Sequence, residues 1–105
     1  MSIESWGGDR PDYKPDVFTT AYNSDQFKVS VTDAESTGSF SQQVMAWFFY
    51  NNGPNPIYFS VNAGVTTDNF KVPAKAYMWG DIPTTSIYFI CDATKTATVY
   101  ALGMW

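Results

Sequence analysis

Apolar and polar residues alternate in short runs from residue 27 onward, and this is the periodicity of β-strands. Residues 27–32 (Phe-Lys-Val-Ser-Val-Thr) give the clearest example. Because side chains of a strand point alternately to its two faces, Phe27, Val29 and Val31 share one face. The pattern therefore predicts a half-buried strand.

Residues 43–50 (Gln-Val-Met-Ala-Trp-Phe-Phe-Tyr) break this alternation because they are apolar on both faces. A helix is the alternative. We favour a strand because residues 47–50 are consecutive strand-forming residues, followed at residues 51–56 (Asn-Asn-Gly-Pro-Asn-Pro) by a dense turn signal. A strand that is apolar on both faces is expected in the middle of a sandwich or beneath a second subunit.

Further short apolar runs follow, separated by Gly, Pro and Asn turns. Pro73 cannot donate to a sheet ladder, so residues 70–72 are expected to form a short or edge strand. The lone Cys91 cannot form an intramolecular disulfide, and its strand-like setting predicts a small buried hydrophobe. Six to eight strands at intervals of roughly ten residues predict an all-β fold, a small antiparallel β-sandwich or jelly-roll-like domain. The short apolar runs that follow residue 56 comprise residues 57–61, 70–72, 76–79, 87–91 and 96–102.

The first 22 residues differ from the rest of the chain. They contain two glycines and two prolines among polar residues, with no apolar periodicity. Residues 1–22 are therefore predicted to form an extended N-terminal arm, and residues 23–105 the β-sandwich domain. Four rings recur along the arm, which a purely solvated tail would seldom carry, so the arm is expected to dock on its own domain or on a neighbour. These rings are Trp6, Tyr13, Phe18 and Tyr22.

Aromatic residues make up 18% of the 105-residue chain, which is more than a core of this size can enclose. Some rings must therefore lie near the surface, where aromatic side chains favour contact with other proteins. The net charge of -4 and the six scattered basic residues argue against a nucleic-acid partner. The chain has neither a membrane-length apolar run nor the features of a signal peptide, so we expect no membrane association and synthesis in a cytoplasm.

Catalytic chemistry finds little support in the sequence. Histidine is absent, which removes the commonest general base and the usual zinc ligand, and one cysteine cannot build a metal site. Gly7-Gly8 lacks the lysine of a phosphate loop, and the acidic residues lack calcium-loop spacing. Asp33 and Glu35 could in principle act on a glycosidic bond, but neighbouring acids in a loop are usually solvating charges. We therefore expect no enzyme, no cofactor and no metal.

The rings divide into expected core and expected interface. Trp47, Phe49, Phe59 and Phe89 are assigned to the core with Ile87, because the space between two sheets must be filled. Other rings fall opposite core positions or beside turns, although edge packing within one chain explains them equally well. The terminal Trp105 would fray into water in a monomer, which favours contact with a neighbouring subunit. With the arm, the predicted interface residues are Trp6, Tyr13, Phe18, Tyr22, Tyr58, Tyr77, Trp79, Tyr88 and Trp105.

The second half of the chain, residues 51–102, resembles a segment of small virion proteins of tailed bacteriophages. An Asn-Asn-Gly turn at 51–53 is followed by Ile-Tyr-Phe-Ser at 57–60 and Gly-Val-Thr-Thr at 64–67. A Pro-Ala pair at 73–74 then precedes Gly-Asp at 80–81, and Ser-Ile-Tyr at 86–88 precedes the final Thr-Ala-Thr-Val at 96–99.

This resemblance implies a capsid decoration (cement) protein or a related head or tail accessory protein. Such proteins are small β domains, often trimeric, that bridge neighbouring capsomers and carry no cofactor or catalytic residues. The implied partners are the major capsid protein and sister subunits of a homotrimer, and the implied location is the capsid surface of the virion. The alternative is a glycan- or receptor-binding module of a phage spike or tail, in which Trp79, Tyr77 and Trp47 stack on sugar rings. An enzyme is a remote third hypothesis.

Overall fold

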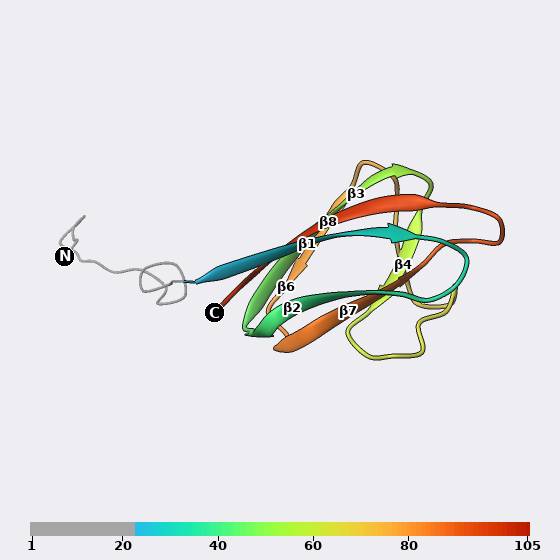
Figure 1. The fold of residues 1–105 in the computed structure, drawn as a ribbon. Helices are drawn as coiled ribbons and strands as arrows, with labels where there is room; N and C mark the ends of the chain where they lie inside the picture. Colours follow the sequence, from blue (N-terminus) through green and yellow to red (C-terminus); the bar gives the residue numbers. More distant parts are fainter. Residues whose placement is uncertain (1–22) are drawn as a thin grey trace.

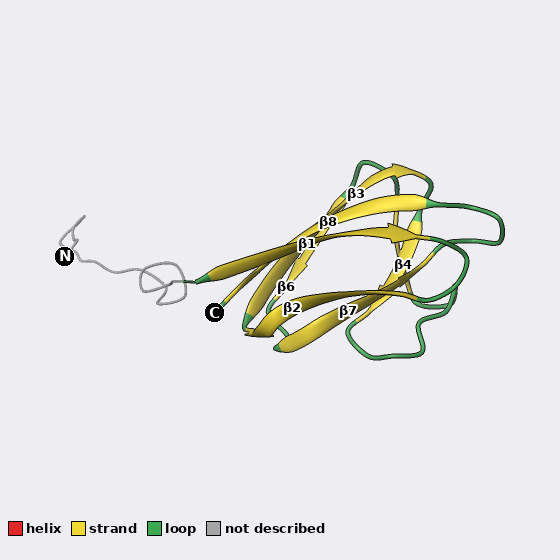
Figure 2. Cartoon of the chain, in the orientation of Figure 1, coloured by secondary structure: helices red, strands yellow, loops and turns green. Residues whose placement is uncertain are grey.

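The computed structural model describes residues 23–105, and these form eight β-strands joined by short loops (Figures 1 and 2). The predictions made for Trp6, Tyr13, Phe18 and Tyr22 lie outside the described residues. Among residues 23–105, no helix is long and apolar enough to cross a membrane. The strands are β1 (Ser24–Val31), β2 (Ser36–Val44), β3 (Ala46–Pro54), β4 (Ile57–Ser60), β5 (Phe70–Val72), β6 (Tyr77–Gly80), β7 (Thr84–Ile90) and β8 (Ala97–Met104).

The strands form two four-stranded sheets that pack face to face, in the orders β1-β8-β3-β6 and β2-β7-β4-β5 (Figure 1). All strand pairs are antiparallel. Strands that follow one another along the chain mostly lie in opposite sheets, and this interleaved order is that of a jelly roll. The predicted fold class is therefore confirmed, and β5 is an edge strand as Pro73 indicated.

The core fills the space between the sheets with side chains from alternate strand positions. Phe49 of β3 lies 5.1 Å from Phe89 of β7 and 4.9 Å from Phe59 of β4, between ring centroids and in edge-to-face geometry. Such pairs contribute about 0.5–1.5 kcal/mol beyond their buried area. The predicted core is confirmed for Trp47, Phe49, Phe89 and Ile87, which are buried, and Phe59 packs against them partly buried.

Cys91 is buried as predicted, with its Sγ 4.0 Å from the carbonyl oxygen of Val31. Burial raises the pKa of the Cys91 thiol to about 11, and the carboxylates of Asp92 and Asp33 add to the rise. The thiol is therefore a packing group rather than a nucleophile.

The predicted single strand over 43–50 is wrong, because the chain changes sheets inside it. Val44 pairs with Thr84 of β7, whereas Ala46 pairs with Met104 of β8. Met45 occupies the corner between the two strands, and its amide donates a 2.7 Å hydrogen bond to the carbonyl oxygen of Met104. A corner of apolar residues cannot be distinguished from a continuous strand by hydrophobicity alone.

Most of β2 also escaped prediction, because its Ser, Thr and Gln residues carry little apolar signal. Gly38 is buried in the middle of this strand. A Cβ atom there would overlap the ring of Phe27, so the missing side chain admits a ring from the opposite sheet. The large side chain that packs at this position of β2 therefore belongs to β1, and the sequence of β2 alone does not reveal it.

The turn predicted to begin at Asn51 starts later, because β3 continues to Pro54 through a bulge. Asn51 is fully buried and its side chain supports the bulge. Its Nδ2 donates to the carbonyl oxygens of Asn55 (2.9 Å) and Val72 (3.1 Å), and its Oδ1 accepts from the amide of Gly53 (2.8 Å). Gly53 has a φ of 81°, which glycine adopts without strain.

Candidate interaction surface

The outward side of the β1-β8-β3-β6 sheet carries two parallel rows of large side chains. One row runs Gln26, Leu102, Phe48 and Trp79 across the four strands, and the other runs Lys28, Tyr100, Tyr50 and Tyr77. Residues directly opposite in an antiparallel sheet have Cβ atoms about 4.5–5.5 Å apart, so each row is continuous. We call the apolar part of this surface the aromatic face; it comprises Phe48, Tyr50, Tyr77, Trp79, Tyr100 and Leu102.

Exposure is concentrated on this face. Trp79 and Tyr77 are 68% and 64% exposed, and Phe48, Tyr100 and Leu102 are also exposed. These five are the majority of the eight large exposed hydrophobic residues in the described chain. Monomeric soluble proteins rarely expose a contiguous apolar patch of this kind unless it serves an interaction.

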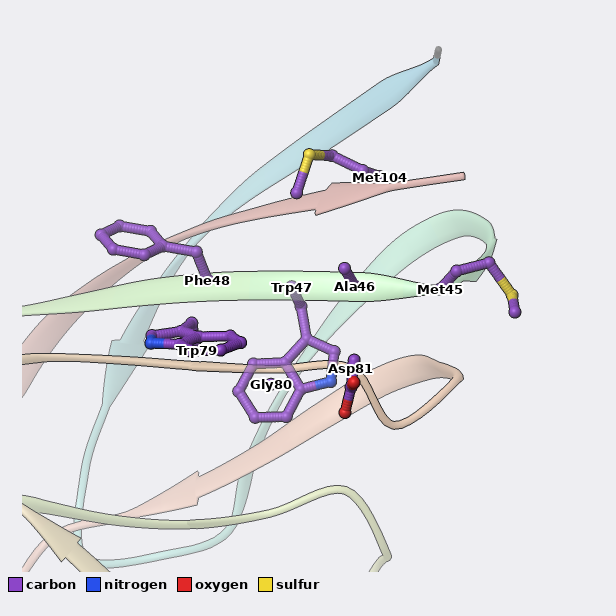
Figure 3. A pocket seen from close by; sticks show the side chains of 8 residues that line it. All are labelled: Met45, Ala46, Trp47, Phe48, Trp79, Gly80, Asp81 and Met104. Carbon is purple, nitrogen blue, oxygen red and sulfur yellow. The ribbon is translucent and has the colours of Figure 1, made fainter. Parts of the chain in front are cut away.

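A pocket of about 480 Å³ lies at one end of the aromatic face (Figure 3). Its walls are mainly apolar, and Asp81 supplies its one charged side chain. Figure 3 shows Trp47 on the opposite side of β3 from Phe48, as the alternation of a strand requires. The lining residues are Met45, Ala46, Trp47, Phe48, Trp79, Gly80, Asp81 and Met104.

The floor of this pocket is fixed by Trp47. Its Nε1 donates a 3.0 Å hydrogen bond to the carbonyl oxygen of Ile82, which satisfies the polar atom of a buried ring. A Cβ atom on Gly80 would lie 2.6 Å from Cζ2 of Trp47, so glycine at this position lets the indole pass beneath β6. The pocket is therefore a preformed feature of the fold.

Two opposite charges lie at the two edges of the face. Lys28 of β1 places its Nζ 5.6 Å from the ring centroid of Tyr100, and Asp81 directly follows β6 at the other edge. Lys75 lies at the far end from Asp81, where its Nζ donates a 2.9 Å hydrogen bond to the carbonyl oxygen of Asn52. The centre of the face carries no charge, which suits the core of a protein interface.

The structure separates the sequence-predicted interface residues. Tyr77 and Trp79 lie together on the aromatic face, and their predicted exposure is confirmed. Tyr88 belongs to β7 in the other sheet, where it is partly buried. It therefore does not belong to the same surface.

The prediction that Tyr58 lies on an exposed interface is wrong, because its side chain is only 8% exposed. Its hydroxyl donates to Oδ1 of Asp92 at 3.2 Å, in the loop that follows β7. Burial raises the pKa of Tyr58, and the Asp92 carboxylate raises it further. A loop distant in sequence covers this tyrosine, and the local strand pattern could not reveal it.

The prediction that Trp105 would fray into water in a monomer is also wrong. Trp105 is partly buried against the core of its own chain. Its amide donates to the carbonyl oxygen of Asn23 at 3.1 Å, and its carbonyl oxygen accepts from the amide of Asn23 at 3.2 Å. These bonds hold the terminal tryptophan, so it does not fray.

Phe48, Tyr100 and Leu102 were not among the predicted interface residues. A signal for two of them was present in residues 97–102, where Ala and Val alternate with Thr, Tyr and Leu. The inward positions of β8 hold the smaller residues, and its outward positions hold Tyr100 and Leu102. A strand with larger apolar residues outside than inside indicates an outer surface that makes contacts.

The carboxylates considered for catalysis serve loop structure. Oδ2 of Asp33 accepts from the amide of Thr94 at 3.0 Å. Oε1 of Glu35 accepts from the amides of Gly64 (2.8 Å) and Val65 (3.0 Å). Within residues 23–105, no group of three or more His, Cys, Asp or Glu side chains is placed to hold a metal ion.

Comparison with known protein families, curated proteins and solved structures found no match. The aromatic face and its pocket are therefore the features from which a function can be argued. The face combines an apolar centre, opposite charges at its edges and a hollow at one end.

Proposed function

We propose that this chain is a non-enzymatic structural protein that acts by adhesion, with the aromatic face as its contact surface. The observation that carries this proposal is the contiguous exposure of Phe48, Tyr77, Trp79, Tyr100 and Leu102 on one sheet. Aromatic side chains are enriched at protein interfaces because a rigid ring buries a large area at a small loss of rotamer entropy.

The biological setting that we propose is a bacteriophage virion, where the protein decorates the capsid surface and binds the major capsid protein. Two arguments support this setting. The jelly roll is a fold of viral capsid and lectin domains, and residues 51–102 resemble small virion proteins. Residues 1–22, with four rings, would supply a second attachment to the shell, beside the aromatic face.

The mechanism is the burial of apolar area at many equivalent positions. Each Å² removed from water contributes about 25 cal/mol before the costs of association are subtracted. A shell presents many copies of the same site, so contacts that are individually weak reinforce one another. Reinforcement of this kind needs no catalytic group.

The test is binding of the full chain to capsids that lack it, measured by co-sedimentation. A Tyr77→Ser and Trp79→Ser double variant removes the two most exposed rings of the aromatic face. Phe70→Ser is the matched control, because Phe70 is 62% exposed but lies on β5 of the other sheet. We expect the double variant to bind at least tenfold more weakly and the control to bind normally, and equal binding by both would refute the proposal.

A glycan-binding module of a phage spike or tail is the second candidate, and the pocket favours it. Trp79 offers an exposed ring in a pocket that Asp81 also lines, and a sugar can stack on an aromatic ring while a carboxylate of the same pocket accepts its hydroxyl hydrogens. Titration of host polysaccharide against tryptophan fluorescence distinguishes the candidates. Saturable binding that is lost in Trp79→Ser would establish the glycan function.

A further inference from the structure

We propose that the occupant of the aromatic face is a second copy of this chain, docked face to face about a twofold axis, with Lys28 of each copy in the pocket of the other. This inference rests on the proposed adhesive function and names the partner of that surface. Attachment to a shell would then use residues 1–22 and other parts of the surface, and pairing through the aromatic face would double these contacts. Loss of the face would therefore still weaken capsid binding, because the paired copies bind the shell together.

The placement of the two charges favours pairing between two copies. Lys28 lies on one edge strand of the sheet and Asp81 follows the other edge strand, so a single copy cannot pair them. In an isologous contact, residue i of one copy meets residue j of the other, and j meets i. Two Lys28–Asp81 pairs would therefore form at once, at opposite edges of the same interface.

The distances between Lys28 and Asp81 determine how two copies would be oriented. β1 and β6 are separated by β8 and β3, which places Lys28 and Asp81 roughly 14 Å apart across the sheet at about 4.8 Å per strand. Lys28 is in register with Tyr50, and Asp81 comes one residue after Gly80, which pairs with Trp47. The two charges are therefore offset by four positions along the strands, or roughly 13 Å.

These two offsets are nearly equal, so the line joining the charges runs diagonally across the strands. A twofold axis in the plane of contact that exchanges the two charges must cross this line at its midpoint, between Leu102 and Phe48. The strands of the two copies then cross at close to a right angle, roughly 90°, which is one of the two preferred ways in which sheets pack. The same axis places the most apolar part of the face at the centre of the interface.

The chemistry of the pocket suits a lysine side chain. The operation that brings Lys28 over Asp81 also brings the lysine side chain over the pocket of the opposite copy. Its four methylenes would pack on Trp79 and Phe48, and its ammonium would reach the Asp81 carboxylate. A tryptophan face also attracts a cation through its ring quadrupole. An apolar hollow with a single carboxylate at its rim matches a lysine side chain.

The size of the face sets the strength of the pairing. Four strands and three rows of side chains, from the row of Lys28 and Tyr50 to the level of Ala46 and Asp81, cover roughly 19 by 20 Å, so two copies would bury on the order of 1,000 Å² in total. Specific interfaces of this size are weak or transient. The average molecular mass in solution is therefore expected to rise from that of a monomer to that of a dimer as the concentration of the full chain increases from about 1 to about 500 µM.

Charge reversal provides the test, by sedimentation velocity on the full chain. Lys28→Glu opposes a carboxylate to Asp81, and Asp81→Lys opposes an ammonium to Lys28, so each variant alone is expected to pair at least tenfold more weakly. An equimolar mixture of the two variants restores attraction at both contacts and is expected to recover the mass of two copies. Lys71→Glu and Asp68→Lys are the matched controls, because Lys71 lies on β5 of the other sheet and Asp68 lies in the loop before it.

The equimolar mixture also distinguishes a twofold dimer from a cyclic trimer. In a head-to-tail trimer the two variants cannot alternate around an odd number of joints, so at least one joint stays repulsive. A wild-type mass of one copy at every concentration, a mass of three copies, or a mixture that fails to recover would overturn the inference. Circular dichroism of each variant confirms that the fold is intact.

The outcome is independent of the test of the proposed function. A chain that stays monomeric but loses capsid binding in the Tyr77→Ser and Trp79→Ser double variant retains the adhesive function and loses this inference. A chain that pairs as described but binds capsids equally well with and without the two rings retains the inference and loses the proposed role of the face in shell attachment.

Discussion

Replacement of Asn51 by alanine tests whether one buried amide holds the end of the sandwich together. The Asn51 side chain joins backbone groups of β3, of the turn that follows it and of β5: the amide of Gly53 and the carbonyl oxygens of Asn55 and Val72. Asn51→Ala removes all three bonds, and the groups that lose them are cut off from bulk solvent because Asn51 is completely buried.

The expected loss follows from the burial of these partners. A buried donor or acceptor that loses its partner costs about 1–3 kcal/mol, and a group that water can reach costs less. Val72 and Gly53 are themselves buried, whereas Asn55 is partly exposed. We therefore expect Asn51→Ala to lower the free energy of unfolding by about 2–4 kcal/mol.

Urea denaturation of the full chain measures this change, and the adjacent residue supplies the control. Asn52 is exposed, so Asn52→Ala should change the free energy of unfolding by less than about 0.5 kcal/mol. Asn51→Asp is a second test. It keeps the oxygen that accepts from the amide of Gly53 but replaces the donor Nδ2 by a carboxylate oxygen, which would face the carbonyl oxygens of Asn55 and Val72. Equal stability of the Asn51→Ala and Asn52→Ala variants would refute the role given to this amide.

Three further predictions concern the core. Phe49→Ala should cost about 3–5 kcal/mol of unfolding free energy, whereas Phe48→Ala, at the next position but on the exposed face, should cost less than about 1 kcal/mol, as measured by thermal or urea unfolding. Gly38→Ala should destabilise by about 1–3 kcal/mol because its methyl group would displace the Phe27 ring, and a neutral result in the same assay would contradict the packing described. Alkylation of Cys91 should be undetectable in the native protein at pH 8 and should accelerate toward its pKa of about 11, because only the thiolate reacts; rapid native modification at pH 8 would contradict its burial.

The strand content could be predicted because it depends on local alternation. Residues 27–32, 57–61 and 87–91 each show the pattern of their own strand, and the structure confirms a strand at each. Residues 43–50 failed because hydrophobicity does not record a change of sheet, which Met45 makes by turning a corner between β2 and β3. The polar strand β2 was not predicted, because Gly38 contributes to core packing through the space that it leaves for the Phe27 ring.

The candidate site could be predicted only in part. Tyr77 and Trp79 were found because they fall opposite core positions or beside turns, and Met78 between them does pack against the core. Tyr58 was misplaced because a loop distant in sequence, at Asp92, covers it. Tyr100 was missed although residues 97–102 alternate in size, because alternation alone does not tell which of the two faces is covered by the other sheet.

The sequence by itself determined that this chain folds as short antiparallel strands, that its core is aromatic, and that it holds more rings than a small sandwich encloses. These properties follow from residue type and spacing, which act over a few residues. Only the tertiary structure decided where the excess rings lie. The jelly-roll order brings β3, β6 and β8 side by side, so rings from three separate segments form one face between Lys28 and Asp81. Strand order is set by the packing of the whole chain, and no single segment encodes it.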